Sequence, residues 1–251
     1  TRTYVIKYFF NKYLNMNLLE LDSYRLHDAI NFHHDLNPQI WGHNDSMRSN
    51  VKKALLNISN DFIVFLGLTD LAVADITLSG SNAGYSYTPY SDIDLHLLVD
   101  FTQINNDDVY RELFDAKKYQ YNDQHDIKIR GYEVEVYVQD ASQQHSSLGE
   151  YSIVNDDWNK IPTKKRANLD DNATKAKYEK LREFILLALA SEDESQINQA
   201  TETIKRYRKA GLAESGEFGP ENLAFKILRK KGLVKKLWDK KAELEDKRMS
   251  I

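Results

Sequence analysis

Apolar residues in the first part of the chain recur at intervals of three and four. Between residues 45 and 68 they take the spacing of one helical face, at Val51, Leu55, Ile58, Phe62 and Phe65. Asp45 or Ser46 would cap this helix, because both side chains accept hydrogen bonds from the first free amides of a helix. Apolar residues between positions 18 and 30 fall loosely on a second helical face. We therefore expect residues 1–68 to be mostly helical.

The pattern changes in the middle of the chain, where polar and apolar residues alternate as they do in half-buried strands. VADITLSGS (residues 73–81) and DIDLHLLVD (residues 92–100) each predict a strand. A helical spacing over residues 105–120 then predicts a helix that begins at Asn106 or Asp107.

Two further alternating strands are predicted within HDIKIRGYEVEVYVQD (residues 125–140), joined by a tight turn at Arg130–Gly131. A polar connector over residues 141–164 is expected to follow. Helical spacing returns in the last third of the chain and predicts three segments, over residues 178–190, 196–213 and 222–247.

These elements together predict an α+β fold, with a small mixed β-sheet core, helices before it and helices after it. We expect residues 1–68 to form an N-terminal helical region that packs on the core. Residues 69–160 would form the core itself, and residues 161–251 a C-terminal helical domain. A chain of 251 residues is long enough for one large domain or two small ones.

Composition removes several classes of protein. The chain has no cysteine, which excludes a disulfide framework and a cysteine-based zinc site. The formal net charge of -4 argues against a surface that binds nucleic acid all over, but leaves room for a local basic face. No apolar run approaches the roughly 18–20 residues that span a bilayer, and the first residues do not read as a signal peptide. We expect a cytoplasmic protein.

Two carboxylates on the second predicted strand are the first candidates for chemistry. Side chains alternate along a strand, so Asp92 and Asp94 point to the same face and lie close together. Two ionised carboxylates in that position repel each other unless a cation lies between them. Magnesium is usually held by one or two carboxylates together with substrate phosphates, so Mg²⁺ (or Mn²⁺) is the expected cofactor.

A Gly-Ser pair ends the preceding strand, ten residues before the carboxylates. Gly80 would allow the backbone to approach a phosphate closely, and the hydroxyl of Ser81 would hydrogen-bond its oxygens. A phosphate cradle beside metal-binding carboxylates is the minimum apparatus for attack on an α-phosphorus.

The third acidic candidate comes from the strand YEVEVYV. Glu133 and Glu135 lie on one face by alternation, so both are eligible, and their bland interpretation is a solvated strand face. Alternation alone does not choose between them.

Gly-Ser, a spacer, and then Ser-Asp-Ile-Asp-Leu resembles the signature of the nucleotidyltransferase superfamily, whose members share a DNA polymerase beta-like catalytic core. The resemblance covers roughly residues 60–140. It implies two-metal transfer of a nucleoside monophosphate from a triphosphate, expected to be ATP, to a hydroxyl acceptor with release of pyrophosphate. It also implies that Asp92, Asp94 and Glu135 are both the metal ligands and the catalytic residues. Glu at the third position is a departure from the commoner Asp.

The same resemblance implies a set of nucleotide-binding residues beyond the carboxylates. These are Gly80 and Ser81 in the cradle, Ser91 directly before the acidic pair, and Lys205 or Arg206 from the helical domain. The basic C-terminal helices favour an RNA end or a nucleotide as the acceptor, and leave a protein or a small molecule open. The later run GEFGPENLAFKILRKKG is loosely similar to phage-encoded proteins, in which case the cytoplasm would be that of a host.

Two other functions fit part of the same pattern. One is a catalytically inactive nucleotide- or RNA-binding module of the same fold, although the intact Gly-Ser and Asp-x-Asp count against it. The other is an unrelated magnesium phosphohydrolase. His96 lies on the same strand as the pair, and we interpret it as a hydrogen-bonded residue of the sheet face rather than a ligand. The loop tyrosines Tyr85, Tyr87 and Tyr90 are interpreted as packing on their own loop.

Overall fold

The computed structural model describes residues 23–67, 72–103, 107–143, 147–164, 167–191 and 193–250. The chain divides into two compact units. The first, here called the sheet unit, is Asn31–Arg166. The second, the helical unit, combines the described residues of Thr1–Ile30 with those of Ala167–Ile251. Each unit is described by itself.

The described residues of the sheet unit form a six-stranded mixed sheet and two long helices. These elements are η2 (His43–Asp45), α3 (Ser49–Leu66), β1 (Val73–Ser79), η3 (Ser81–Ala83), β2 (Ile93–Val99), η4 (Phe101–Gln103), α4 (Asp107–Gln124), β3 (Lys128–Ile129), β4 (Tyr132–Asp140), β5 (Glu150–Ser152) and β6 (Asp157–Lys160).

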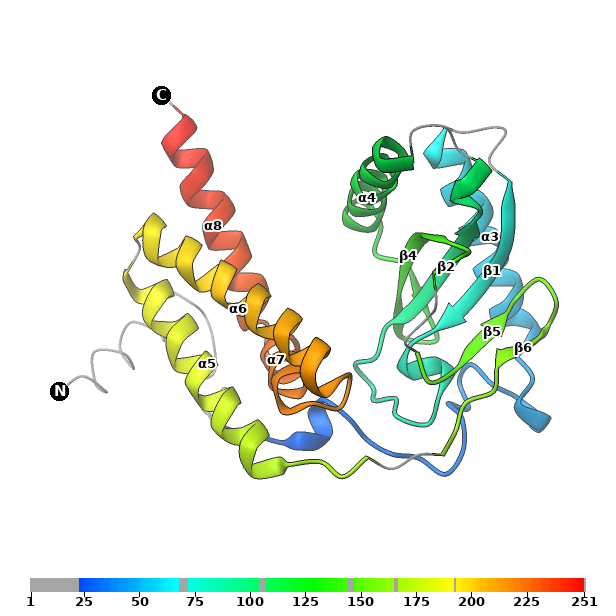
Figure 1. The fold of residues 1–251 in the computed structure, drawn as a ribbon, viewed down its shortest axis with the longest axis horizontal. Coiled ribbons are helices and arrows are strands. Elements are labelled where there is room, and N and C mark those ends of the chain that lie inside the picture. Colours follow the sequence, from blue (N-terminus) through cyan, green and yellow to red (C-terminus); the bar gives the residue numbers. More distant parts are fainter. Residues whose placement is uncertain are drawn as a thin grey trace. The chain divides into compact units, whose positions relative to one another are not determined.

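The strand order is β3-β4-β2-β1-β5-β6, and the central strands are visible side by side in Figure 1. Strand β2 pairs antiparallel with β1 and parallel with β4. The crossover between β2 and β4 contains α4, which is how a chain joins neighbouring parallel strands. The α+β fold and the mixed sheet predicted from the sequence are confirmed.

One face of this sheet is apolar and forms the core. Leu78, Leu95 and Val136 are fully buried there, against side chains of α3 and α4 such as Leu55 and Phe114. Alternation sends the intervening side chains to the opposite face, which is polar. The polar face therefore carries whatever chemistry the sheet performs.

Two expectations for this unit were wrong. Helix α3 begins at Ser49, so its N-cap position is Arg48, and neither Asp45 nor Ser46 is placed to cap it. The predicted polar connector contains β5 and β6, which extend the sheet beyond β1. Strand β5 has only three residues, too few to show an alternating pattern, and it joins the sheet by pairing with β1.

The predicted turn between β3 and β4 is confirmed. Arg130 and Gly131 both have positive φ, 54° and 90°, as the two central residues of a tight hairpin turn require. Glycine adopts this conformation at no steric cost, which explains its place at the second position.

The helical unit contains the short turn η1 (Leu26–Asp28) and the helices α5 (Asp171–Ser191), α6 (Glu194–Ser215), α7 (Pro220–Lys230) and α8 (Leu233–Met249). The third predicted helical segment is therefore two helices. Gly232, with a φ of +72°, interrupts the helix between them. Leu233 and Leu237 of α8 are buried, as is Leu223 of α7. Among the described residues, no helix has the length and apolar character that crossing a membrane requires.

Residues 23–30 belong to the helical unit, whereas the sequence analysis placed residues 1–68 on the sheet core. Asp28 is buried, with Nζ of Lys230 on α7 at 2.5 Å and Nε of Arg25 at 3.3 Å. Burial alone would raise the pKa of Asp28, but these two cations hold it below its usual value. Tyr24 adds a hydrogen bond to Asp171 at 2.7 Å. The boundary between the two units therefore lies near Ile30, and residues 1–22 are outside the described part of the chain.

Candidate active site

The polar face of the sheet brings three strands together in one row of side chains. Asp94 on β2 is the direct partner of Ser79 on β1 and of Glu135 on β4. Partners in adjacent strands share a face, so the carboxylates of Asp94 and Glu135 lie side by side. The row lies at the amino-terminal ends of the parallel strands β2 and β4.

Asp92 joins the row from the residue position just before β2. Its backbone carbonyl accepts a hydrogen bond from Nδ2 of Asn82 at 2.8 Å. Asn82 is buried and is itself held by Nδ2 of Asn37 at 2.8 Å and by Nε1 of Trp41, which donates to its carbonyl at 2.7 Å. The segment that carries the Asp-x-Asp pair is therefore fixed to the loop that follows β1.

Gly80 is required by its neighbour Asp94. Its φ is +76° and its ψ is -162°, a conformation that is essentially restricted to glycine. A β-carbon added at Gly80 would lie 1.9 Å from Oδ2 of Asp94. The sequence analysis expected a phosphate to approach Gly80 closely. In the structure the space above the α-carbon accommodates the Asp94 carboxylate, and the Gly80 amide donates to Oγ of Ser147 at 3.1 Å.

Ser81 and Ser91 close the loop between the Gly-Ser pair and the carboxylates. Oγ of Ser81 donates to Oγ of Ser91 at 2.7 Å, and Ser91 also accepts from the amide of Thr88 at 3.0 Å. Two hydroxyl groups carry two hydrogens and only one is used in their shared bond. Within the described residues Ser91 donates no hydrogen bond, so its hydroxyl hydrogen is not used in holding the loop.

Glu133 and Glu135 have different surroundings, although they are two residues apart. The side chain of Glu133 is 64% exposed and lies 3.8 Å from Nζ of Lys128. Lys128 is its register partner on β3 in the hairpin. Glu135 is half-buried and lies beside Asp94. The geometry favours Glu135 as the third carboxylate of the row.

Tyr137 lies next to this row, and the sequence analysis did not identify it. Its hydroxyl donates a hydrogen bond to Oε2 of Glu135. Burial raises the pKa of Tyr137 far above its usual value, and the carboxylates of Asp94, Glu135 and Asp92 raise it further. Alternation along β4 could have placed Tyr137 on this face, but nothing in the sequence shows a tyrosine bonded to a carboxylate.

The donor set fits a hard divalent cation in its chemistry. Asp92, Asp94 and Glu135 supply only carboxylate oxygens, and magnesium usually takes one or two carboxylates together with substrate phosphates. As the described side chains stand, they include no group of three or more His, Asp or Glu residues arranged to hold a metal ion.

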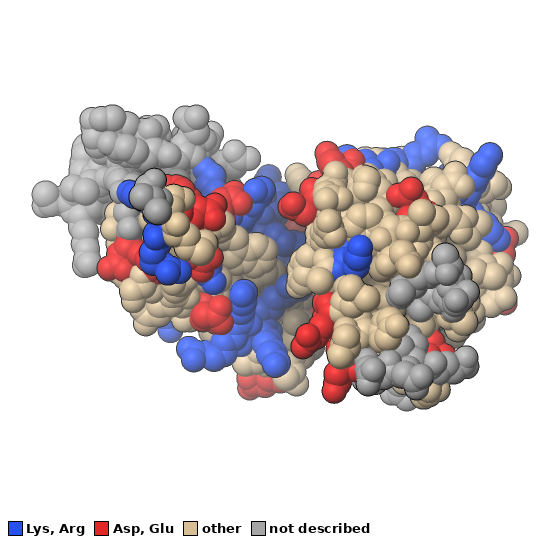
Figure 2. Space-filling model, turned by 90° about the horizontal axis from the view of Figure 1, so that it is seen from above, with Lys and Arg blue, Asp and Glu red and all other residues tan. Residues whose placement is uncertain are grey.

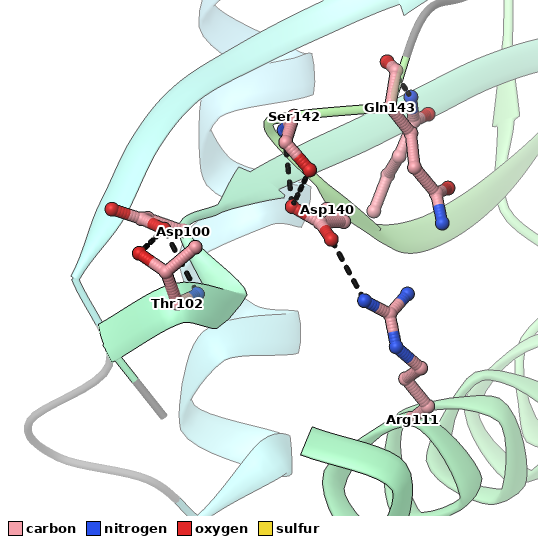
Figure 3. Close-up of polar contacts among 7 residues, drawn as sticks. Asp100, Thr102, Arg111, Asp140, Ser142 and Gln143 are labelled. Carbon is pink, nitrogen blue, oxygen red and sulfur yellow. Dashed lines mark hydrogen bonds and ion pairs between the residues drawn. The ribbon is translucent and has the colours of Figure 1, made fainter. Parts of the chain in front are cut away.

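The far ends of β2 and β4 are fixed by a separate polar cluster, shown in Figure 3. Asp140, the partner of Val99 in the register, accepts hydrogen bonds from the amide and hydroxyl of Ser142 at 3.0 and 2.9 Å. Its other oxygen accepts a bond from Arg111 on α4 at 2.7 Å (Figure 3). The backbone of Ser142 and then the guanidinium of Arg111 hold the pKa of Asp140 below its usual value. This cluster lies at the opposite end of the β2–β4 pair from Asp94 and Glu135.

His96 and Tyr87 take structural positions. Nε2 of His96 lies 3.0 Å from Oγ of Ser79, in agreement with a histidine of the sheet face. Tyr87 is buried and stacks on His33 at 3.8 Å between ring centres, whereas Tyr90 is 53% exposed.

Lys205 and Arg206 belong to the other compact unit. Both are exposed on α6, and Nζ of Lys205 lies 3.5 Å from Glu202 on the same helix. The face of the helical unit seen in Figure 2 carries groups of Lys and Arg side chains interrupted by Asp and Glu. The structure does not assign these two residues to the candidate site.

Comparison with family models, with curated protein sequences and with solved structures gives no match for this chain.

Proposed function

We propose that the sheet unit is a magnesium-dependent nucleotidyltransferase with a polymerase beta-like catalytic core. The observation that carries the proposal is the pairing of Asp94 with Glu135 across β2 and β4, next to a glycine that leaves room for the Asp94 carboxylate. Such a concentration of negative charge on a folded sheet is costly unless a cation offsets it. The hydroxyl of Ser91 in the adjoining loop would add a hydrogen-bond donor for a phosphate oxygen of the triphosphate.

The reaction is transfer of a nucleoside monophosphate from a triphosphate, with ATP as the proposed donor. An acceptor hydroxyl oxygen forms a bond to the α-phosphorus, the bond to the bridging oxygen breaks, and pyrophosphate leaves. Magnesium or manganese, when bound, lowers the pKa of the acceptor hydroxyl and offsets the charge of the phosphates. Asp92 and Asp94 would hold it together with Glu135.

Glu135 and Ser91 would have further roles in the reaction. Glu135 would accept the proton of the acceptor hydroxyl, because it is the half-buried carboxylate at the end of the row. Ser91 would donate its hydroxyl hydrogen to a phosphate oxygen. Lys205 and Arg206 are proposed, on charge alone, to neutralise the triphosphate or an RNA acceptor. The acceptor classes are an RNA end, a nucleotide, a protein or a small molecule.

A catalytically inactive binding module of the same fold is the second candidate. It is favoured by one observation: the Gly80 amide and the Ser81 hydroxyl both hydrogen-bond within the protein rather than facing outward. The intact row of carboxylates favours the enzyme.

Incubation with each of the four nucleoside triphosphates and Mg²⁺ or Mn²⁺, in separate reactions that contain RNA, a nucleotide, a protein or a small molecule as the acceptor, separates the candidates. We expect pyrophosphate to be released, and none from the double variant Asp92→Asn/Asp94→Asn when circular dichroism shows it to be folded. Release of inorganic phosphate alone would identify a phosphohydrolase instead. Triphosphate binding without either product would support the inactive module.

A further inference from the structure

The hydroxyl group of Tyr137 donates a hydrogen bond to the carboxylate of Glu135. It reaches Oε2 from the position two residues along β4, on the same face. In the register, Tyr137 is the partner of His96, just as Glu135 is the partner of Asp94. The bond therefore lies along the strand, beside the row of carboxylates.

The Tyr137 ring is supported from two directions. It stacks on the imidazole of His96, with ring centres 4.9 Å apart and an interplanar angle of 15°. His96 is buried and is held in turn by Ser79 on β1 at 3.0 Å. The ammonium group of Lys118 on α4 lies 4.1 Å from the ring centre, an attractive arrangement for a cation over an aromatic face. A chain of contacts thus runs across β1, β2 and β4 to the Tyr137 hydroxyl.

Glu135 needs such a support. A glutamate side chain has several rotatable bonds, and fixing them costs conformational entropy. Its neighbour Asp94 also repels it, so a free Glu135 carboxylate would turn away from the row. A donor attached to a rigid ring opposes both effects, since hydrogen bonds to charged groups are stronger than those between neutral groups.

We propose that Tyr137 is a positioning residue that holds the Glu135 carboxylate beside Asp94. The inference rests on the proposed function, because it assigns Tyr137 a role through the third carboxylate of that site. Tyr137 contacts neither substrate nor metal in this role. It prepares Glu135 to accept the acceptor's proton and to complete the ligand set.

The test removes only the hydroxyl. Tyr137→Phe keeps the ring, its stack on His96 and its contact with Lys118. We expect kcat to fall about tenfold and KM for ATP to change little, because a charged hydrogen bond is lost at a carboxylate that the nucleotide does not need for binding. The affinity for Mn²⁺ without nucleotide, measured by calorimetry, should also fall severalfold. Tyr132→Phe is the matched control, because it removes a hydroxyl from the same strand on the core side and should change neither quantity.

A double-variant cycle decides whether Tyr137 acts through Glu135. In a Glu135→Gln background, Tyr137→Phe should cause no further loss of Mn²⁺ affinity, because the charged partner is already absent. An equal loss in both backgrounds, or a Tyr137→Phe variant that behaves as wild type, would overturn the proposal. A Tyr137→Phe chain that does not fold would overturn it too, since it would make the hydroxyl a support of the fold.

The proposed function can fail separately. The wild-type protein could transfer no nucleotide while Tyr137→Phe still lowers Mn²⁺ affinity in wild type and not in the Glu135→Gln background. In that case the positioning role stands and the proposed reaction is wrong. If transfer depends on Asp94 but not on the Tyr137 hydroxyl, the reaction stands and the positioning role is wrong.

Discussion

Gly80 and Asp94 occupy the same small space: a β-carbon on the glycine would lie 1.9 Å from Oδ2 of the aspartate. The two residues are brought together because β1 ends at Ser79, whose partner across the sheet is Asp94. The Gly-Ser pair and the Asp-x-Asp pair therefore depend on each other sterically, before any phosphate is considered.

Gly80→Ala should cost both stability and activity. Its φ and ψ of 76° and -162° would strain any other residue by roughly 1–3 kcal/mol, and the clash with Asp94 should add about 1–3 kcal/mol. Gly216 is a matched control, since its φ and ψ are 69° and -162° and a β-carbon there would meet nothing within 4 Å. Urea unfolding should show a smaller loss for Gly216→Ala, which should remain active. Adding Asp94→Ala to Gly80→Ala should recover the stability that Gly80→Ala loses in excess of Gly216→Ala. If the double-variant cycle shows no such coupling, the two residues do not compete for this space.

The two glutamates of β4 should have unequal importance. Glu135→Gln should lower the rate at least about a hundredfold, because it removes the candidate base and one carboxylate of the row. Glu133→Gln should lose little, because that side chain is 64% exposed and pairs with Lys128. Steady-state rates of pyrophosphate release with ATP and Mg²⁺ provide the measurement. The reverse ranking would transfer the catalytic role to Glu133.

The serine pair predicts a selective effect on triphosphate affinity. Ser91→Ala should weaken ATP binding about tenfold to a hundredfold, because a hydroxyl hydrogen bond to a charged oxygen is lost. Ser81→Ala should lose less, since Ser91 keeps its outward hydrogen. AMP, titrated in parallel, should respond weakly to either change because it lacks the outer phosphates. Equal losses for ATP and AMP, or a larger loss from Ser81→Ala, would place the triphosphate tail elsewhere.

Asp140 should stabilise the fold in a pH-dependent way. Its folded-state pKa is lowered by the backbone of Ser142 and by Arg111, so its contribution is present above the unfolded pKa of about 3.9 and is lost as pH falls through the folded value. Asp140→Asn should reduce the free energy of unfolding at pH 7 by about 1–3 kcal/mol, and this difference from wild type should shrink below about pH 4. Asp115→Asn, on the exposed side of α4, is the control. A pH-independent difference would exclude the charge of Asp140 as its cause.

Strong periodicity explains which parts of the fold the sequence predicts. Strands β1 and β2 alternate over five residues each, in DITLS and IDLHL, and the Arg130–Gly131 turn has a distinctive dipeptide. These elements and the common face of Asp92 and Asp94 therefore follow from local pattern. The pairing of Asp94 with Glu135 requires the strand order and the register of a parallel pair. Local sequence does not contain that information.

The missed features have tertiary causes. Strand β5 is three residues long and exists because it pairs with β1, so its own sequence carries no clear alternation. Gly232 interrupts a helical pattern that continues on both sides, and only the packing of Leu233 into the core explains the break. Tyr137 is an ordinary strand residue by sequence, and its hydrogen bond to Glu135 is visible only once the strand is folded.

The most direct test of the central claim follows the fate of the α-phosphate. The wild-type protein is incubated with α-labelled ATP, Mg²⁺ and, in separate reactions, RNA, nucleotide, protein or small-molecule acceptors, and the products are separated. We predict that label moves to one acceptor class with an equal amount of pyrophosphate, and that folded Asp94→Asn loses this transfer by at least about a hundredfold. Label that stays in ATP, or transfer that is unchanged in Asp94→Asn, would contradict the assignment of a nucleotidyltransferase site to this row of carboxylates.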